Sequence, residues 1–109
     1  MQEIKTSKQK LIDRVYKLLP IYEGKLLGTE ERLPEAEAYR NFQTNINMAV
    51  NSMLGVVRLT GQKEYIEDVI LILMGLKSVG VGNREIVRKS IFKCVKLIER
   101  LGDDYGNNI

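Results

Sequence analysis

The chain has 109 residues, of which 44% are hydrophobic and 28% are charged, and its formal net charge is +3. These proportions are typical of an ordinary globular domain and exclude a long disordered chain. Histidine is absent, which removes the commonest general base and the usual zinc ligand. We therefore expect a protein that is not an enzyme and that needs no metal or other cofactor.

The cysteine content and the hydropathy indicate where in the cell the protein is located. Cys94 is the only cysteine, so an internal disulfide is excluded, and a lone thiol fits a reducing compartment better than a secreted one. The first residues lack the apolar core of a signal peptide. The longest apolar run, residues 69–76, is about half as long as a bilayer crossing requires. We expect a cytoplasmic protein without membrane insertion.

Apolar residues recur at helical spacing along most of the chain, which predicts an all-α fold. The first helix is predicted for residues 3–19. Pro20 should end or kink it, because proline lacks a backbone donor and clashes with the preceding turn. A connector containing Gly24 and Gly28 then leads to a long second helix, predicted for residues 34–59, with a proline in its first turn.

Two further helices follow in the second half of the chain. The third is predicted for residues 63–79, and its centre, residues 69–74, is apolar on every side. Such a helix should be covered by neighbours all round. Asn83 is a suitable N-cap for the fourth helix, which should stop at Gly102.

The links between the last three helices are about three residues long, which favours antiparallel neighbours. We therefore predict an antiparallel up-down four-helix bundle with an unusually long second helix. Residues 1–102 would form this single domain, and residues 103–109 a flexible C-terminal tail.

The second helix contains an uncharged stretch, residues 41–57, between Arg40 and Arg58. Outward helix faces normally carry charges, and depletion of charge is typical of an interface core. The alternatives are a neutral face tolerated in water and a face covered by the first helix. The pattern favours self-association as a homodimer through this helix. The candidate interface residues are Asn41, Asn45, Asn47, Asn51, Ser52 and Gly55.

Basic side chains follow one line of the fourth helix, opposite its apolar side, and the first helix is expected to extend the patch. Such a face could bind nucleic acid or an acidic partner, although a solvated lysine-rich face is the commoner explanation. We expect no aromatic residue to interleave with this line, which disfavours single-stranded nucleic acid. The candidate residues are Arg84, Arg88, Lys89, Lys93, Lys96 and Arg100 of the fourth helix and Lys10, Arg14 and Lys17 of the first.

Three other patterns have structural explanations that outweigh the functional ones. The glycines of residues 80–84 fit a helix C-cap and a tight turn better than an anion-binding loop. The acidic residues that open the third helix complement its dipole. Cys94 lies on the apolar side of the fourth helix and should be a buried thiol.

The sequence thus favours a non-catalytic helical protein-interaction protein, of the adaptor or inhibitor type, that self-associates through its second helix and binds another protein. The alternative is an accessory protein that binds nucleic acid irrespective of sequence through the basic face of the first and fourth helices.

Overall fold

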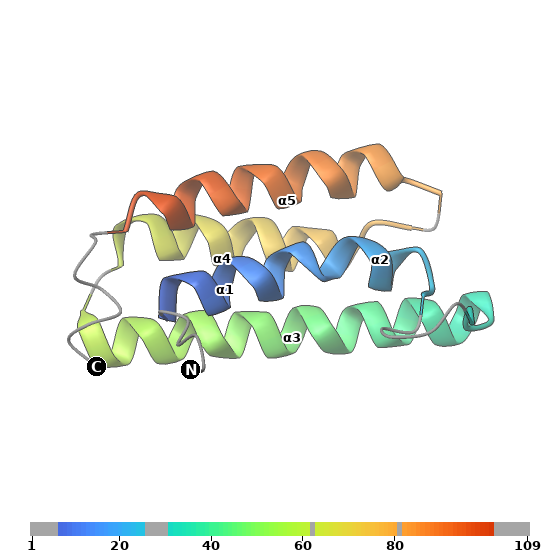
Figure 1. Ribbon diagram of the computed structural model, residues 1–109, viewed down its shortest axis with the longest axis horizontal. Helices are drawn as coiled ribbons and strands as arrows, with labels where there is room; N and C mark the ends of the chain where they lie inside the picture. The colour runs from blue at the N-terminus through green and yellow to red at the C-terminus, as the bar shows by residue number, and fades with distance from the viewer. Residues whose placement is uncertain (1–6, 26–30, 62, 81, 102–109) are drawn as a thin grey trace, which may run out of the picture.

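A computed structural model describes residues 7–25, 31–61, 63–80 and 82–101 (Figure 1). The predicted all-α class is confirmed, since the only β-type pairing among these residues is an isolated bridge between Lys25 and Arg32. No helix in the described ranges is both long and apolar enough to cross a membrane. The predicted C-terminal tail and the start of the predicted first helix lie outside these ranges. The helices are α1 (Ser7–Tyr16), α2 (Leu18–Tyr22), α3 (Glu35–Thr60), α4 (Glu64–Leu76) and α5 (Arg84–Glu99).

The predicted first helix is divided into α1 and α2, and the break lies at Lys17 rather than at Pro20. Pro20 has no N–H to donate to the carbonyl of Tyr16, so the regular hydrogen-bond pattern cannot continue there. The chain turns at Lys17 instead and begins a new helix with the proline in its first turn, where a missing donor costs little. α2 therefore includes Pro20 and continues as far as Tyr22.

The ends of α3 follow from residues that sequence analysis identified. Pro34 precedes the helix with extended backbone angles, and Gly61 ends it at a positive φ of 72°. The Gly61 N–H donates to the carbonyl of Val57 at 2.9 Å, which satisfies one of the last free carbonyls. The 26 residues of α3 extend over roughly 39 Å. Its fully buried side chains recur every three or four residues: Phe42, Ile46, Ala49 and Met53.

The helices pack side by side around one apolar core. α3 packs against α4, α4 against α5, and α5 against α1, while α2 contacts both α3 and α5. Figure 1 shows α5 and α3 at opposite edges of the molecule, with α1, α2 and α4 between them. Every described side chain that is buried is apolar. The core is therefore held by hydrophobic burial, and α3 and α5 each keep an outward side.

The apolar centre of α4 is not covered all round. Val69 and Leu73 are fully buried, but Leu71 is 68% exposed and Met74 is 52% exposed. The prediction that neighbours enclose this segment is therefore wrong for a single chain. Among the described helices α4 packs chiefly against α3 and α5, and the side that carries Leu71 and Met74 stays exposed.

The start of α5 also differs in detail from the prediction. Asn83 occupies the N-cap position, but its side chain makes no capping hydrogen bond. Its Nδ2 instead donates to the carbonyl of Gly80 at 2.9 Å. The side chain therefore stabilises the turn before the helix and leaves the first helical amides uncapped by it.

Candidate functional site

The uncharged stretch of α3 has two different sides. Asn47 and Asn51 are exposed, whereas Asn41, Asn45 and Ser52 are half-buried. Asn45 Nδ2 donates to the carbonyl of Asn41 at 2.8 Å, and Ser52 Oγ donates to the carbonyl four residues earlier at 3.1 Å. The half-buried residues thus bond within their own helix. Of the predicted interface asparagines, Asn47 and Asn51 remain the most accessible to another chain.

The half-buried residues lie on the side of α3 that faces Gly24, just after the end of α2. Ala38 marks that side, because its Cβ lies only 3.3 Å from the point where a Cβ on Gly24 would stand. Asn45 and Ser52 follow Ala38 at intervals of seven residues, so the three lie along nearly one line of the helix. These half-buried residues therefore share the side of α3 that carries Ala38, while the outer side with Asn47 and Asn51 stays open.

α4 extends the exposed uncharged surface of α3. Gln43 Nε2 donates to the carbonyl of Lys77 at 3.1 Å, which brings the end of α4 beside the first half of α3. Met74 and Leu71 lie one and two turns before Lys77, and residues 69–76 carry no charge. We call the combined surface the uncharged face. It comprises Thr44, Asn47, Asn51 and Leu54 of α3 with Leu71, Met74 and Gly75 of α4.

Gly55 borders the uncharged face in the last two turns of α3. It is half-buried, its φ is not positive, and a Cβ built on it would meet no atom within 4 Å. Glycine inside a helix costs about 1 kcal/mol relative to alanine. Neither backbone geometry nor the packing of the described chain requires a glycine here. Close approach of another backbone would require one.

The basic side chains of α5 fall into two groups that differ in their partners. Lys89, Lys93 and Lys96 are exposed, and within the described part of the chain no carboxylate pairs with any of them. Arg100 is also exposed, and its guanidinium lies 5.7 Å from the ring centroid of Tyr65. We call these four residues the basic face.

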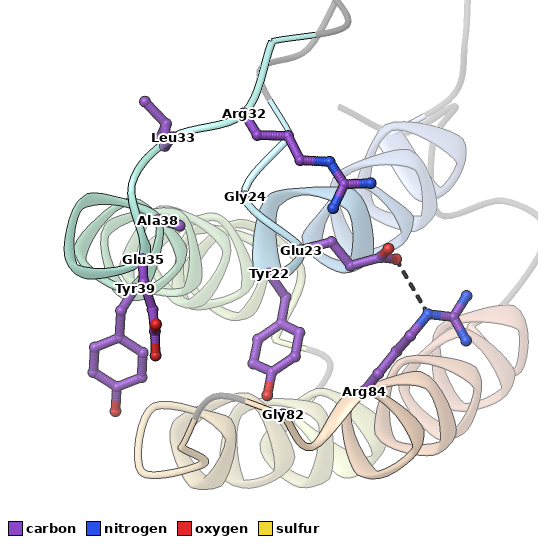
Figure 2. A pocket seen from close by; sticks show the side chains of 10 residues that line it. All are labelled: Tyr22, Glu23, Gly24, Arg32, Leu33, Glu35, Ala38, Tyr39, Gly82 and Arg84. Atoms are coloured by element: carbon purple, nitrogen blue, oxygen red, sulfur yellow. Dashed lines mark hydrogen bonds and ion pairs between the residues drawn. The ribbon is translucent and has the colours of Figure 1, made fainter.

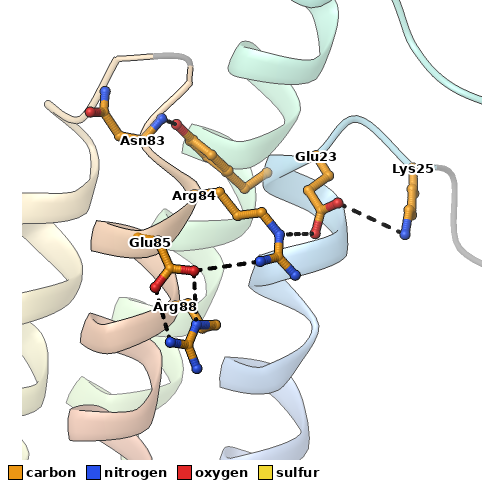
Figure 3. A network of polar contacts seen from close by, with 7 residues as sticks. Glu23, Lys25, Asn83, Arg84, Glu85 and Arg88 are labelled. Atoms are coloured by element: carbon orange, nitrogen blue, oxygen red, sulfur yellow. Dashed lines mark hydrogen bonds and ion pairs between the residues drawn. The ribbon is translucent and has the colours of Figure 1, made fainter.

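Arg84 and Arg88 belong to an ion-pair network at the start of α5 (Figure 3). Arg84 Nε lies 3.3 Å from a carboxylate oxygen of Glu23, and Arg88 Nη2 lies 2.9 Å from Glu85. The hydrogen bond and charge of Arg88 lower the pKa of Glu85, and Glu85 in turn raises the pKa of Arg88. Because both arginines already have carboxylate partners, they are less available to phosphate than the basic face.

The predicted extension of the patch onto α1 is not brought next to the basic face. Lys8 Nζ donates to the carbonyl of Glu99 at 2.8 Å, and Tyr16 contacts Phe92, so these two residues mark the side of α1 that faces α5. At 100° per residue, the predicted basic residues lie roughly 140° to 160° around the helix from that side. They are Lys10, Arg14 and Lys17.

An aromatic pair borders the basic face, contrary to the expectation from the sequence. The rings of Tyr16 and Phe92 meet edge to face with centroids 6.3 Å apart and an interplanar angle of 80°. Tyr16 is 45% exposed and Phe92 is 43% exposed. The prediction that no aromatic residue interleaves with the basic line is therefore wrong. Phe92 lies among the basic residues of α5, and Tyr16 joins it only through the packing of α1.

A surface cavity of about 400 Å³ opens where α2 ends and α3 and α5 begin (Figure 2). Tyr22 forms part of its wall, and the tyrosine hydroxyl donates to the carbonyl of Gly80 at 2.6 Å and accepts from the N–H of Asn83 at 2.8 Å. This tyrosine therefore attaches the turn before α5 to α2. The charged lining residues balance one another, so the cavity selects neither cations nor anions, and we assign it no ligand. They are Glu23, Arg32, Glu35 and Arg84.

Cys94 is fully buried in the core, as predicted. Burial raises the pKa of its thiol from 9.0 to about 12, so the reactive thiolate is scarce at neutral pH. Within the described ranges, no group of three or more acidic or cysteine side chains is arranged to hold a metal ion.

Comparison of the chain with protein-family models, with curated proteins and with solved structures found no match. The surface features that could bind a partner are the uncharged face, the basic face and the aromatic pair beside it.

Proposed function

We propose that this chain is a non-catalytic helical protein-interaction protein, of the adaptor or inhibitor type, that pairs with a second copy of itself through α3. In this proposal the chain is an antiparallel up-down four-helix bundle, with α1 and α2 together as its first helix and α3 as its long second helix. A cytoplasmic location fits the single buried thiol. The exposure of Leu71 and Met74 beside the uncharged stretch of α3 is the observation that carries the proposal.

The composition of the uncharged face favours a second copy as its occupant. In a symmetric dimer the same patch lies on both sides of the interface, so every charge near the axis would meet a like charge. A surface without charges avoids that repulsion and also matches the core of known interfaces. The residues that α3 offers at the centre are short and neutral, such as Asn47 and Asn51, and Gly55 allows close approach.

The size of the face sets the expected strength of the pair. The uncharged stretch of α3 is about 25 Å long, and two packed helices are about 20 Å wide, so each copy contributes on the order of 500 Å². Two copies then bury about 1,000 Å², which is at the lower limit for a specific interface. We therefore expect a reversible dimer with a dissociation constant on the order of micromolar.

Sedimentation equilibrium tests the dimer directly. The wild-type chain should change from monomer to dimer between about 1 and 200 µM, and Asn47→Lys and Asn51→Lys should remain monomeric because each would bury an unpaired charge. Gln9→Lys is a matched control, because it adds the same charge to an exposed position on α1. A wild-type chain that stays monomeric at 200 µM would contradict the proposal.

The alternative function is binding of nucleic acid irrespective of sequence through the basic face. It is supported by the three α5 lysines that are exposed and have no carboxylate partner in the described chain. Binding should weaken steeply with salt, because each neutralised phosphate releases a counterion. Combined charge reversal at Lys89, Lys93 and Lys96 should abolish a mobility shift at low salt. Absence of any shift by the wild-type chain would contradict this alternative.

A further inference from the structure

We propose that the aromatic pair Tyr16–Phe92 and the basic face together form a site for single-stranded nucleic acid, in which bases stack on the exposed rings. This inference rests on the nucleic-acid alternative above and goes beyond it, because cations alone would serve single strands and duplexes alike. It does not depend on the dimer, since α3 and α5 lie at opposite edges of the molecule (Figure 1).

The two rings lie where neighbouring helices hold them at the surface. Tyr16 comes from the end of α1 and Phe92 from the middle of α5, and their edge-to-face contact leaves each side chain more than 40% exposed. Base stacking on aromatic side chains is the main source of affinity that accessible rings can offer to a single strand. Both side chains are thus partly exposed, with the Arg88 guanidinium over one face of the Phe92 ring, and they are held by neighbouring helices rather than by a loop.

Positive charge surrounds the Phe92 ring. On the surface of α5, Phe92 has Arg88 one turn before it, Lys89 three residues before it and Lys96 one turn after it. The guanidinium of Arg88 lies 5.6 Å from the ring centroid of Phe92, and its charge is balanced by Glu85. The unpaired lysines therefore supply the excess positive charge beside the ring.

The spacing of the cations suits a short length of backbone. Lys89, Lys93, Lys96 and Arg100 follow one side of α5 over roughly 16 Å, at about 1.5 Å per residue. Phosphates placed along this line would bring adjacent bases to the edge where the rings lie. A strand of a few nucleotides can therefore contact the cations and the aromatic pair together.

Single strands fit these features better than the other anionic partners. The bases of a duplex are already stacked on one another, so they cannot reach the rings without being unpaired. An acidic peptide would use the lysines and leave the aromatic pair unused. An anionic membrane would bind the lysines and accept the rings, but a membrane-binding surface gives no reason for the chain to prefer single strands over duplexes.

Fluorescence anisotropy with a labelled oligo(dT) strand and a duplex of equal length tests the inference. The wild-type chain should bind the strand more tightly than the duplex. Phe92→Leu and Tyr16→Leu should weaken strand binding about 5-fold to 150-fold with the slope of affinity against salt unchanged, because they remove stacking and keep every charge. Combined replacement of Lys89, Lys93 and Lys96 by glutamine should weaken both complexes and lower that slope.

A tryptophan reporter tests the stacking contact independently of affinity. The chain contains no tryptophan, so Phe92→Trp introduces a single such fluorophore and keeps an aromatic ring at the site. Its emission should be quenched when oligo(dT) is added. Leu71→Trp is the matched control, because Leu71 is 68% exposed but lies on the uncharged face, and its emission should not change.

The outcomes separate this inference from the alternative on which it rests. One outcome overturns the stacking site alone. In that outcome binding depends on the lysines, is equal for strand and duplex, and is unaffected by Phe92→Leu in a variant whose circular dichroism is native. Absence of any nucleic-acid binding at low salt overturns both. Binding to poly-glutamate or to phosphatidylserine vesicles that exceeds binding to oligo(dT) assigns the surface to that partner and overturns the inference.

Discussion

Leu71→Lys tests the uncharged face at its most exposed large residue. Within one chain this substitution should have little effect, because 68% of Leu71 is already in solvent and lysine forms helices about as readily as leucine. Surface changes of this kind alter the free energy of unfolding by about 0.5 kcal/mol or less. A large effect is therefore expected only where a second chain covers the residue.

The magnitude for the dimer follows from the exposed fraction. Full burial of a leucine side chain contributes about 1.5 to 3 kcal/mol, so covering the 68% that remains exposed contributes about 1 to 2 kcal/mol. A symmetric pair loses this contribution twice, or about 2 to 4 kcal/mol. The dissociation constant should rise about 30-fold to 1,000-fold, before any added cost of burying two ammonium groups.

Two measurements separate the dimer from the fold. Sedimentation equilibrium gives the dissociation constant, and urea unfolding at a concentration where the wild type is monomeric gives the stability of one chain. Ile86→Lys is the matched control, because Ile86 is 53% exposed on α5 and lies outside the uncharged face. A Leu71→Lys variant that dimerises as tightly as the wild type would contradict a dimer through the uncharged face. Equal weakening of the dimer by Ile86→Lys would contradict it as well.

Three further predictions concern stability. Gly55→Ala should raise the free energy of unfolding of the monomer by about 1 kcal/mol in urea, because the new Cβ meets no atom within 4 Å. The same substitution should weaken the dimer. A monomer that is not stabilised would contradict the open space around Gly55. Phe42→Ala should lower the free energy of unfolding by about 3 to 5 kcal/mol, because this fully buried ring leaves a cavity; a loss below about 1 kcal/mol would contradict its burial. The pKa of Cys94 is raised from 9.0 to about 12, so the unfolded thiol ionises at a lower pH than the folded one. The free energy of unfolding of the wild type should therefore fall by about 1.4 kcal/mol per pH unit above about pH 9, relative to Cys94→Ala. Equal pH dependence of the two proteins in urea unfolding would contradict the burial of the thiol.

The helical class and most helix ends could be predicted from local sequence patterns. The recurrence of Phe42, Ile46 and Met53 at three- and four-residue intervals is a local property, because it follows from the pitch of the helix alone. The ends of α3 likewise depend on Pro34 and Gly61, whose backbone preferences act on their immediate neighbours. The absence of charge along the middle of α3 could also be seen in the sequence, and it led to the candidate interface.

The end of α1 could not be predicted from the local sequence alone. Pro20 indicates that the helix is interrupted, but the break lies at Lys17 and the chain stays helical to Tyr22. Proline removes a hydrogen bond without specifying which residue absorbs the change. α2 packs against both α3 and α5, and these contacts cannot be read from the local sequence.

The packing of the helices determines which side of each helix remains open. Among the described helices α4 packs chiefly against α3 and α5, and Leu71 and Met74 stay exposed, which an all-apolar sequence does not reveal. The same packing brings Tyr16 of α1 against Phe92 of α5 and turns Lys10 away from α5. A helical pattern determines which residues share a side. The rotation of each helix against its neighbours is set by how the whole core packs. This rotation produces the uncharged face and the aromatic pair.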